Sequence, residues 1–419
     1  MLRPILWPLL LFVYLILPNL SFAHLDPADP GMQWVAVRTP TKELRTKLVN
    51  LGVSIENVID DMSYGFATTA TLPLIEDAGL KLESSMLAKN IRALDFPPDD
   101  ALYHNYERQM SFMGELADKN PQLVKVFSIG KSVENRNIWA IRINPDIDDG
   151  EKISAKPGIV FMGGHHAREH LSVELPLLLA QYLVENYGTD PTVTNLVNTR
   201  DIFLIPSVNP DGSEYDIANG NYRMWRKNRA QNSGARCSGV DLNRNYGFQW
   251  GTGGSSKDSC SDVFMGQNSF SEPETQAIKK FVESKPNLKV LLSFHTYSEL
   301  ILYPWGHKYD SITNTTDLNA FTQMAQAMAK WNGYTPQQSS ELYIASGDTT
   351  DWSYGTLGIF SFTFELSPSQ WGSGGFYPGA GAIESTFQAN IKPALYLIDL
   401  ADNPRRAVLN PETTLFYGR

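Results

Sequence analysis

Cysteine is scarce in this chain of 419 residues, in which only Cys237 and Cys260 occur. Zinc sites and iron–sulfur clusters that are built on cysteine need three or four thiolates, so the sequence excludes them. No cluster of lysine and arginine stands out, and 45 acidic against 35 basic residues give a formal charge of −10. A nucleic-acid-binding surface is therefore not expected. The remaining composition, with 42% hydrophobic and 19% charged residues, is that of an ordinary globular protein.

A long hydrophobic run occurs at one place, over Ile5–Leu17 near the start of the chain. This run has 13 residues between Pro4 and Pro18, whereas a membrane-spanning helix needs about 20. Ser21 and Ala23 are small residues at the −3 and −1 positions of a cleavage site. The pattern predicts a secretory signal peptide over residues 1–23, hence a secreted protein (extracellular or periplasmic) with no membrane anchor.

Secretion determines how the two cysteines are interpreted. In an oxidising compartment an even pair predicts a disulfide between Cys237 and Cys260, which would stabilise the fold by about 3 kcal/mol. A catalytic thiol is the weaker alternative.

The rest of the chain divides into two parts with different patterns. In the first, short segments alternate between strand and helix periodicity, which predicts a small α/β sandwich over residues 24–96 that ends in a linker. Its expected elements are strands at 34–37, 64–70 and 81–86 and helices at 41–51 and 72–79. The second part, over 97–402, predicts an α/β fold with a mixed, mostly parallel sheet and helices on both faces. Its expected elements are strands at 159–162, 201–206, 290–295 and 360–366 and helices at 169–187, 317–331 and 383–400. Residues 403–419 form a tail.

Three of the seven histidines lie in the segment 163–170, directly after a predicted strand. His166 and Glu169 form a His-x-x-Glu pair, and His295 ends another apolar strand. Two histidines and one carboxylate form a tetrahedral zinc set with the fourth position open. His165 competes for a place in this set, but the residue three positions later is Arg168, which cannot bind a metal.

Charged residues in two other segments suggest a substrate site. Arg226 belongs to a basic run that could also be a solvated face, whereas Asn243 and Arg244 follow a short apolar segment and fit an anion-binding site. Glu365 lies inside an apolar strand, where a carboxylate is costly unless it is paired or functional. A general base and a structural partner both remain possible roles for it.

These blocks and their order resemble the secreted zinc carboxypeptidases of the metallocarboxypeptidase (carboxypeptidase A/B and T) family. The resemblance covers residues 103–402 and includes the segments 166–169, 225–227, 240–245, 295–297, 342–352 and 364–366. The N-terminal part resembles the inhibitory pro-domain of that family, and both cysteines fall where mammalian-type members have a disulfide. The resemblance implies a zinc carboxypeptidase fold, peptide and protein C-termini as substrates, an activating protease and a monomer.

The resemblance also implies a role for each matched residue. One Zn²⁺ would be held by His166, Glu169 and His295, with Asp241 orienting a ligand imidazole from outside. Glu365 would be the general base and Arg226 would stabilise the oxyanion. The terminal carboxylate of the substrate would be bound by three residues, Asn243, Arg244 and Tyr343. Arg168 would bind the substrate further upstream.

Asp348 and Thr350 resemble the side-chain pocket of carboxypeptidase T, which implies mixed specificity for hydrophobic and basic C-terminal residues. The alternative is that Asp348 caps a turn and faces water.

Two other functions are weighed against that of a carboxypeptidase. An amidase or deacylase on the same fold would have no use for a carboxylate clamp, and a non-catalytic binding protein would not need an intact Glu365 and Arg226.

Overall fold

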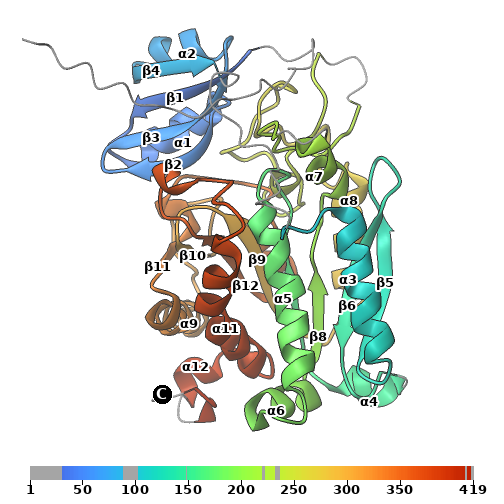
Figure 1. Ribbon diagram of the computed structural model, residues 1–419. Coiled ribbons are helices and arrows are strands. Elements are labelled where there is room, and N and C mark those ends of the chain that lie inside the picture. Colours follow the sequence, from blue (N-terminus) through green and yellow to red (C-terminus); the bar gives the residue numbers. More distant parts are fainter. Residues whose placement is uncertain are drawn as a thin grey trace, which may run out of the picture.

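The computed structural model describes residues 31–87, 102–147, 149–218, 222–231, 236–410 and 413–416. They form a small N-terminal sheet layer and a larger helix–sheet–helix layer structure (Figure 1). Within these ranges, every helix is too short or too polar to cross a membrane. The predicted signal peptide and the predicted linker, residues 89–100, lie outside the described residues.

The N-terminal part is a four-stranded antiparallel sheet with the strand order β2-β3-β1-β4. Val35 and Val37 alternate along β1 and pack against Leu48 and Ile75 of the two helices. The predicted α/β sandwich is therefore confirmed, although the sequence patterns did not predict the strand β2. The elements are β1 (Met32–Arg38), α1 (Lys42–Asn50), β2 (Ser54–Ile59), β3 (Met62–Thr68), α2 (Leu72–Asp77) and β4 (Lys81–Leu87).

The larger part contains an eight-stranded sheet with the order β11-β10-β12-β9-β7-β8-β6-β5. Its centre, from β12 to β8, is parallel, and β10, β6 and β5 add antiparallel pairs. The predicted mixed, mostly parallel sheet is confirmed. The strands are β5 (Val124–Lys131), β6 (Asn137–Ile143), β7 (Gly158–Met162), β8 (Asp201–Ile205), β9 (Leu288–Thr296), β10 (Leu300–Tyr303), β11 (Thr335–Gln338) and β12 (Phe360–Leu366).

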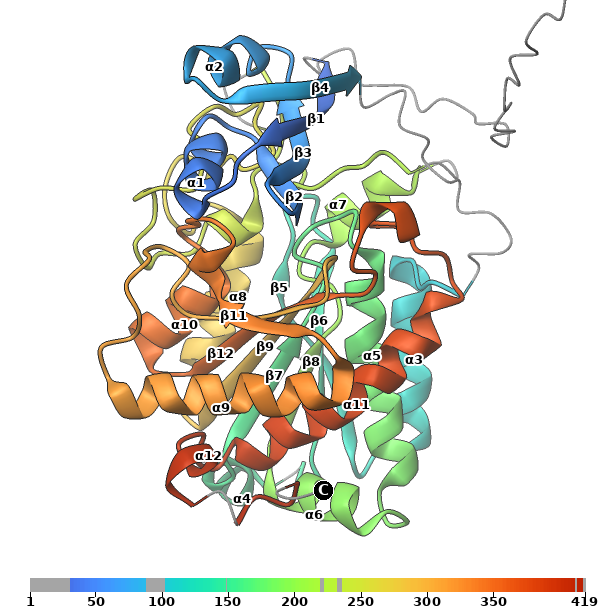
Figure 2. The same cartoon turned by 90° about the vertical axis from the view of Figure 1, so that its left-hand side faces the viewer.

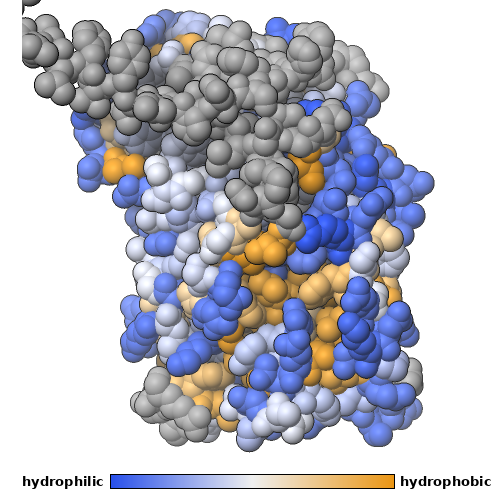
Figure 3. Space-filling model, in the orientation of Figure 1, coloured by the Kyte–Doolittle hydropathy of each residue, from blue (hydrophilic) through white to orange (hydrophobic). Residues whose placement is uncertain are grey.

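Helices cover both faces of this sheet because its central strands are apolar on both faces. Phe161 and Leu292 belong to the core under one set of helices, whereas Val160 and Leu291, their chain neighbours, belong to the core under the other set. The first set is α3 (Tyr106–Lys119), α5 (His170–Asn186), α6 (Pro191–Thr199), α9 (Thr315–Asn332) and α11 (Ala382–Leu400). The second set includes α8 (Pro273–Glu283) and α10 (Thr349–Leu357). Apolar residues also gather on the outer surface near α5, between hydrophilic areas (Figure 3).

The described part of the tail packs back onto the helices. Phe416 makes edge contacts with Trp331 of α9 and Tyr396 of α11, and the Leu415 backbone N–H donates to Asp399. The short helix α12 (Arg406–Leu409) lies within this segment. The tail therefore belongs to the packed structure.

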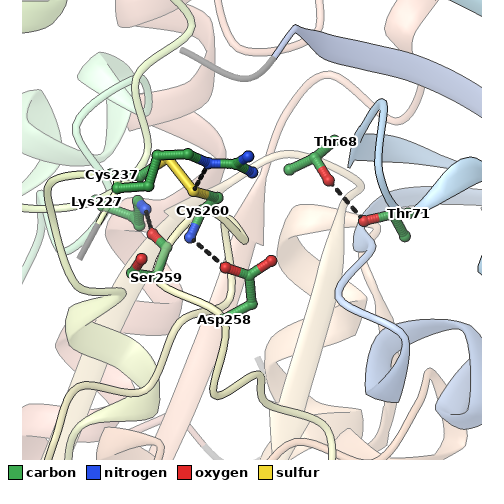
Figure 4. Close-up of a disulfide and its surroundings, with 8 residues drawn as sticks. Thr68, Thr71, Lys227, Cys237, Asp258, Ser259 and Cys260 are labelled. Atoms are coloured by element: carbon green, nitrogen blue, oxygen red, sulfur yellow. Dashed lines mark hydrogen bonds between the residues drawn. A yellow bond between two sulfur atoms is a disulfide. The ribbon is translucent and has the colours of Figure 1, made fainter. Parts of the chain in front are cut away.

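Cys237 and Cys260 form a disulfide, as predicted, with a Cα–Cα distance of 5.0 Å. Figure 4 shows the bridge beside Lys227, whose Nζ donates to the Ser259 carbonyl over 2.7 Å. The disulfide and this hydrogen bond tie two loops together next to Arg226. Both loops are therefore close to Arg226, which lies at the carboxyl ends of the central strands.

Candidate active site

The three predicted metal ligands meet at the carboxyl ends of adjacent parallel strands. His166 and Glu169 lie in the turn between β7 and α5, and His295 is the next-to-last residue of β9. Glu169 Oε1 lies 2.7 Å from His166 Nδ1, and Glu169 Oε2 lies 3.0 Å from His295 Nδ1. The two Nδ1 atoms are 3.1 Å apart. The turn needs Gly163, because a Cβ there would lie 2.0 Å from the Ser172 carbonyl oxygen.

The hydrogen bonding of His166 shows that this cluster suits a cation. His166 Nε2 lies 3.1 Å from Asp241 Oδ1, and because an ionised carboxylate only accepts, Nε2 carries the proton. With the proton on Nε2, Nδ1 is the ring nitrogen that faces Glu169 and the centre of the cluster. Two imidazole nitrogens and a carboxylate, all buried, are a donor set that fits Zn²⁺.

Asp241 also binds Arg226, and the pair is fully buried. Arg226 Nε and Nη2 lie 3.1 and 3.0 Å from Asp241 Oδ2. Burial by itself would raise the pKa of Asp241, but the charge of Arg226 and the hydrogen bond from His166 outweigh it and hold this pKa well below its usual range. Asp241 therefore stays ionised and holds a ligand imidazole and a guanidinium at the same time.

Glu365 lies on β12 directly beside His295 on β9 in the parallel register. It is the one partly exposed residue in an otherwise buried strand. Burial and the charge of Glu169 raise the pKa of Glu365 well above its usual value. A carboxyl group with a raised pKa beside a metal cluster suits a group that exchanges protons.

The three predicted carboxylate-binding residues lie next to this centre. Asn243 and Arg244 belong to the short helix η4 (Leu242–Arg244), which Asp241 caps by accepting from the Asn243 backbone N–H over 2.9 Å. Arg244 is held by the carbonyl oxygens of Gly254 and Asn243, both at 2.9 Å. Tyr343 is close enough to Arg244, Arg226 and Glu365 for their charges to act on its hydroxyl group, whose pKa is raised by burial.

Asp348 and Thr350 lie at the start of α10. Asp348 Oδ1 caps the helix by accepting from the backbone N–H groups of Thr350 and Asp351. The capping alternative is thus correct, but the side chain is buried rather than facing water. Its Oδ2 has no partner among the described residues and lies close to Gly306. Thr350 is hydrogen-bonded to the Thr363 hydroxyl over 2.7 Å.

Arg168 is completely buried by residues of both parts of the chain. It forms ion pairs with Glu56 of β2 and with Asp262, and its guanidinium lies between the rings of Phe66 and Phe376. Glu56 also lies 3.9 Å from Arg226. The sequence patterns did not single out Glu56, because it lies in a strand that they did not predict.

Comparison with known proteins gives a consistent result. Residues 109–392 match the family model described as zinc carboxypeptidase. A zinc carboxypeptidase of Saccharothrix mutabilis subsp. capreolus is 36% identical over 408 residues, covering 90% of this chain and 91% of the relative. Carboxypeptidase A1 of Bos taurus is 33% identical over 383 residues, covering 89% of this chain and 86% of the relative. The crystal structure of carboxypeptidase A from Helicoverpa armigera superposes with a TM-score of 0.73 at 25% identity, covering 92% of this chain and 99% of the other.

The fold and the site thus define a metal-dependent hydrolase, and the chain belongs to the zinc carboxypeptidase family. It is a metallocarboxypeptidase that uses one zinc ion.

Replacing Asp241 by Asn should weaken zinc binding by about 10- to 100-fold, because His166 would lose the carboxylate that fixes its tautomer. Competition with a chromogenic chelator measures the dissociation constant. The zinc-free variant should unfold cooperatively, which separates metal loss from misfolding. Unchanged zinc affinity in a folded variant would contradict this role of Asp241.

Proposed function

We propose that the chain is a secreted, latent carboxypeptidase that removes single hydrophobic or basic residues from peptide C-termini. The observation that carries this proposal is the position of Glu365 beside His295 and of Arg226 beside Glu169, at the cluster His166, Glu169 and His295. An acid–base group, a fixed positive charge and a metal-binding set are then available to one peptide bond.

In the proposed mechanism, Glu365 accepts a proton from the attacking water and later delivers it to the leaving amine. Zinc, when bound, contributes positive charge that lowers the pKa of a water molecule and polarises the carbonyl. Arg226 stabilises the negative charge that develops on the carbonyl oxygen. Asp241 keeps the guanidinium of Arg226 in place, so that little reorganisation is needed during the reaction.

The restriction to the last residue is assigned to Asn243, Arg244 and Tyr343. A guanidinium fork binds a carboxylate through two hydrogen bonds, and an amide and a phenol add further donors. A peptide without a free C-terminal carboxylate would leave these donors, including the buried Arg244, without that partner. This argues against the alternative of an amidase or deacylase.

Mixed specificity is assigned to Asp348. Its Oδ2 has no partner among the described residues, and Gly306 beside it carries no side chain that would fill the space needed by a lysine or arginine end. Burial and the charge of Asp351 raise the pKa of Asp348 to about 8. Near neutral pH, the carboxyl is therefore largely protonated and the pocket accepts apolar side chains as well.

Latency is assigned to the N-terminal part as a pro-domain over residues 24–96. Its sheet lies over the carboxyl ends of the large sheet (Figure 2). Glu56 lies within ion-pair distance of Arg168 and Arg226, where it would block a substrate. Trp34 packs against Trp371, with ring centroids 4.6 Å apart. The Thr46 hydroxyl is hydrogen-bonded to the Tyr309 hydroxyl. It also accepts from the backbone N–H of Ile344, the residue next to Tyr343. Cleavage in the linker near residues 89–92 would release this cover.

Replacing Glu365 by Gln should lower kcat by 10²- to 10⁴-fold on peptides with a free C-terminus, because the amide cannot accept the proton. Steady-state assays after limited trypsin treatment measure this loss. Zinc content should equal that of the wild type. A variant that retains more than a tenth of the wild-type kcat would contradict the general-base role.

Replacing Asp348 by Asn should remove a pH-dependent preference for basic ends. In the wild type, the ratio of kcat/KM for Lys-ended over Leu-ended peptides should rise between pH 7 and 9 as Asp348 ionises. In the variant this ratio should stay low and flat, while Asn still caps α10. Identical pH profiles for the two proteins would contradict the assignment.

Replacing Glu56 by Ala should raise the activity of the uncut chain at least tenfold, because the cover would lose its ion pair with Arg168. Glu83→Ala is the matched control, since Glu83 lies on β4 and its ion pairs with described residues are those with Arg38 and Lys81 of the same N-terminal part. Full activity of the uncut wild type would contradict latency.

A further inference from the structure

A continuous row of hydrogen-bonded side chains links the proposed zinc ligand His295 to the proposed substrate-binding residue Asn243. Ser293 Oγ lies 3.1 Å from His295 Nε2 and 3.2 Å from His165 Nδ1. On the far side of the ring, His165 Nε2 lies 3.1 Å from Thr349 Oγ1, which lies 3.0 Å from Asn243 Oδ1. The three linking side chains are 0 to 1% exposed.

The direction of the hydrogen bonds is fixed from the Asn243 end. The Thr349 backbone N–H, which can only donate, lies 3.0 Å from the Asn243 side chain, so the atom that faces it is the amide oxygen. The Thr349 hydroxyl faces the same oxygen and must donate its one proton to it. Its oxygen then accepts from His165 Nε2–H. The Tyr246 hydroxyl, 2.9 Å away, is a second acceptor for this N–H.

The same reasoning continues to the metal cluster. With the proton of His165 on Nε2, its Nδ1, which lies 3.2 Å from Ser293 Oγ, accepts from Ser293 Oγ–H. The Ser293 oxygen then accepts from His295 Nε2–H. This leaves the lone pair of His295 Nδ1 directed at the cluster, where Glu169 lies 3.0 Å away. At the other end, the NH₂ group of Asn243 is left for the substrate.

We propose that Ser293, His165 and Thr349 are positioning residues that set, through one chain of hydrogen bonds, the tautomer of His295 and the amide orientation of Asn243. The proposal rests on the proposed roles of those two residues. Because each linking group has a single proton to donate, reversing one bond forces the next to reverse. The chain therefore couples metal binding to recognition of the substrate carboxylate, and losing a link affects both ends.

The test compares Thr349→Val, which removes the hydroxyl at nearly constant shape, with Thr349→Ser, which keeps it. Ser293→Ala cuts the chain at the other end. Thr322→Val is the control, because the Thr322 hydroxyl donates to the Leu318 carbonyl oxygen within α9, away from this row of side chains. Zinc dissociation constants are measured on the uncut chain by chelator competition, and kcat and KM for a free-acid peptide are measured after limited trypsin treatment.

We expect Thr349→Val to raise KM about tenfold with kcat within about twofold, and Thr349→Ser to restore most of this loss. Ser293→Ala should weaken zinc binding about tenfold and should also raise KM at saturating zinc, although it does not touch Asn243. Combining Thr349→Val with Ser293→Ala should raise KM by less than the product of the two single effects.

Equal KM values for the Val and Ser variants of Thr349, or unchanged zinc affinity and KM in Ser293→Ala, would overturn the positioning role. Asn243→Ala separates this outcome from failure of the proposed function. If that variant raises KM while the chain variants do not, the carboxylate clamp stands and only the positioning role is wrong. If Asn243→Ala leaves KM unchanged, the clamp itself is wrong, and the positioning role with it.

Discussion

The buried carboxylate of Asp241 is the interaction on which the site depends. One of its oxygens fixes the proton of His166, the other binds Arg226, and the first also caps the helix that carries Asn243. His166, the guanidinium of Arg226 and the helix that carries Asn243 are thus tied to a single side chain. Because Asp241 is shielded from water, each of these charge-assisted bonds is stronger and more directional than it would be at the surface.

The sheet brings these groups together. Parallel strands end at the same edge, so the ends of β7, β9 and β12 place His166, His295 and Glu365 next to one another although they are far apart in sequence. So many buried charges are tolerated only when each lies beside a charge of opposite sign. In this chain the compensation extends to Glu56 of the N-terminal sheet, which binds Arg168. The same contact supports the proposed latency, since it covers groups that a substrate would need.

The sequence predicted the central parallel strands, the long helices α5, α9 and α11 and the metal cluster, because long apolar patterns and His-x-x-Glu spacing are local signals. It did not predict the short strands β10 and β11, whose four residues each carry too little periodicity. Glu56 was missed because its partner Arg168 is 112 residues away. Ser293 and Thr349 were missed for a similar reason, since hydroxyl groups acquire a role only through the neighbours that the fold supplies.

The most direct test of the account uses the full chain after limited trypsin treatment. It is mixed with peptides that end in Phe, Leu, Lys or Arg and with the matching C-terminal amides, with and without a zinc chelator. We expect release of single residues from the free acids only, and loss of this activity on chelation. Cleavage of the amides at comparable rates, or hydrolysis that survives chelation, would contradict it.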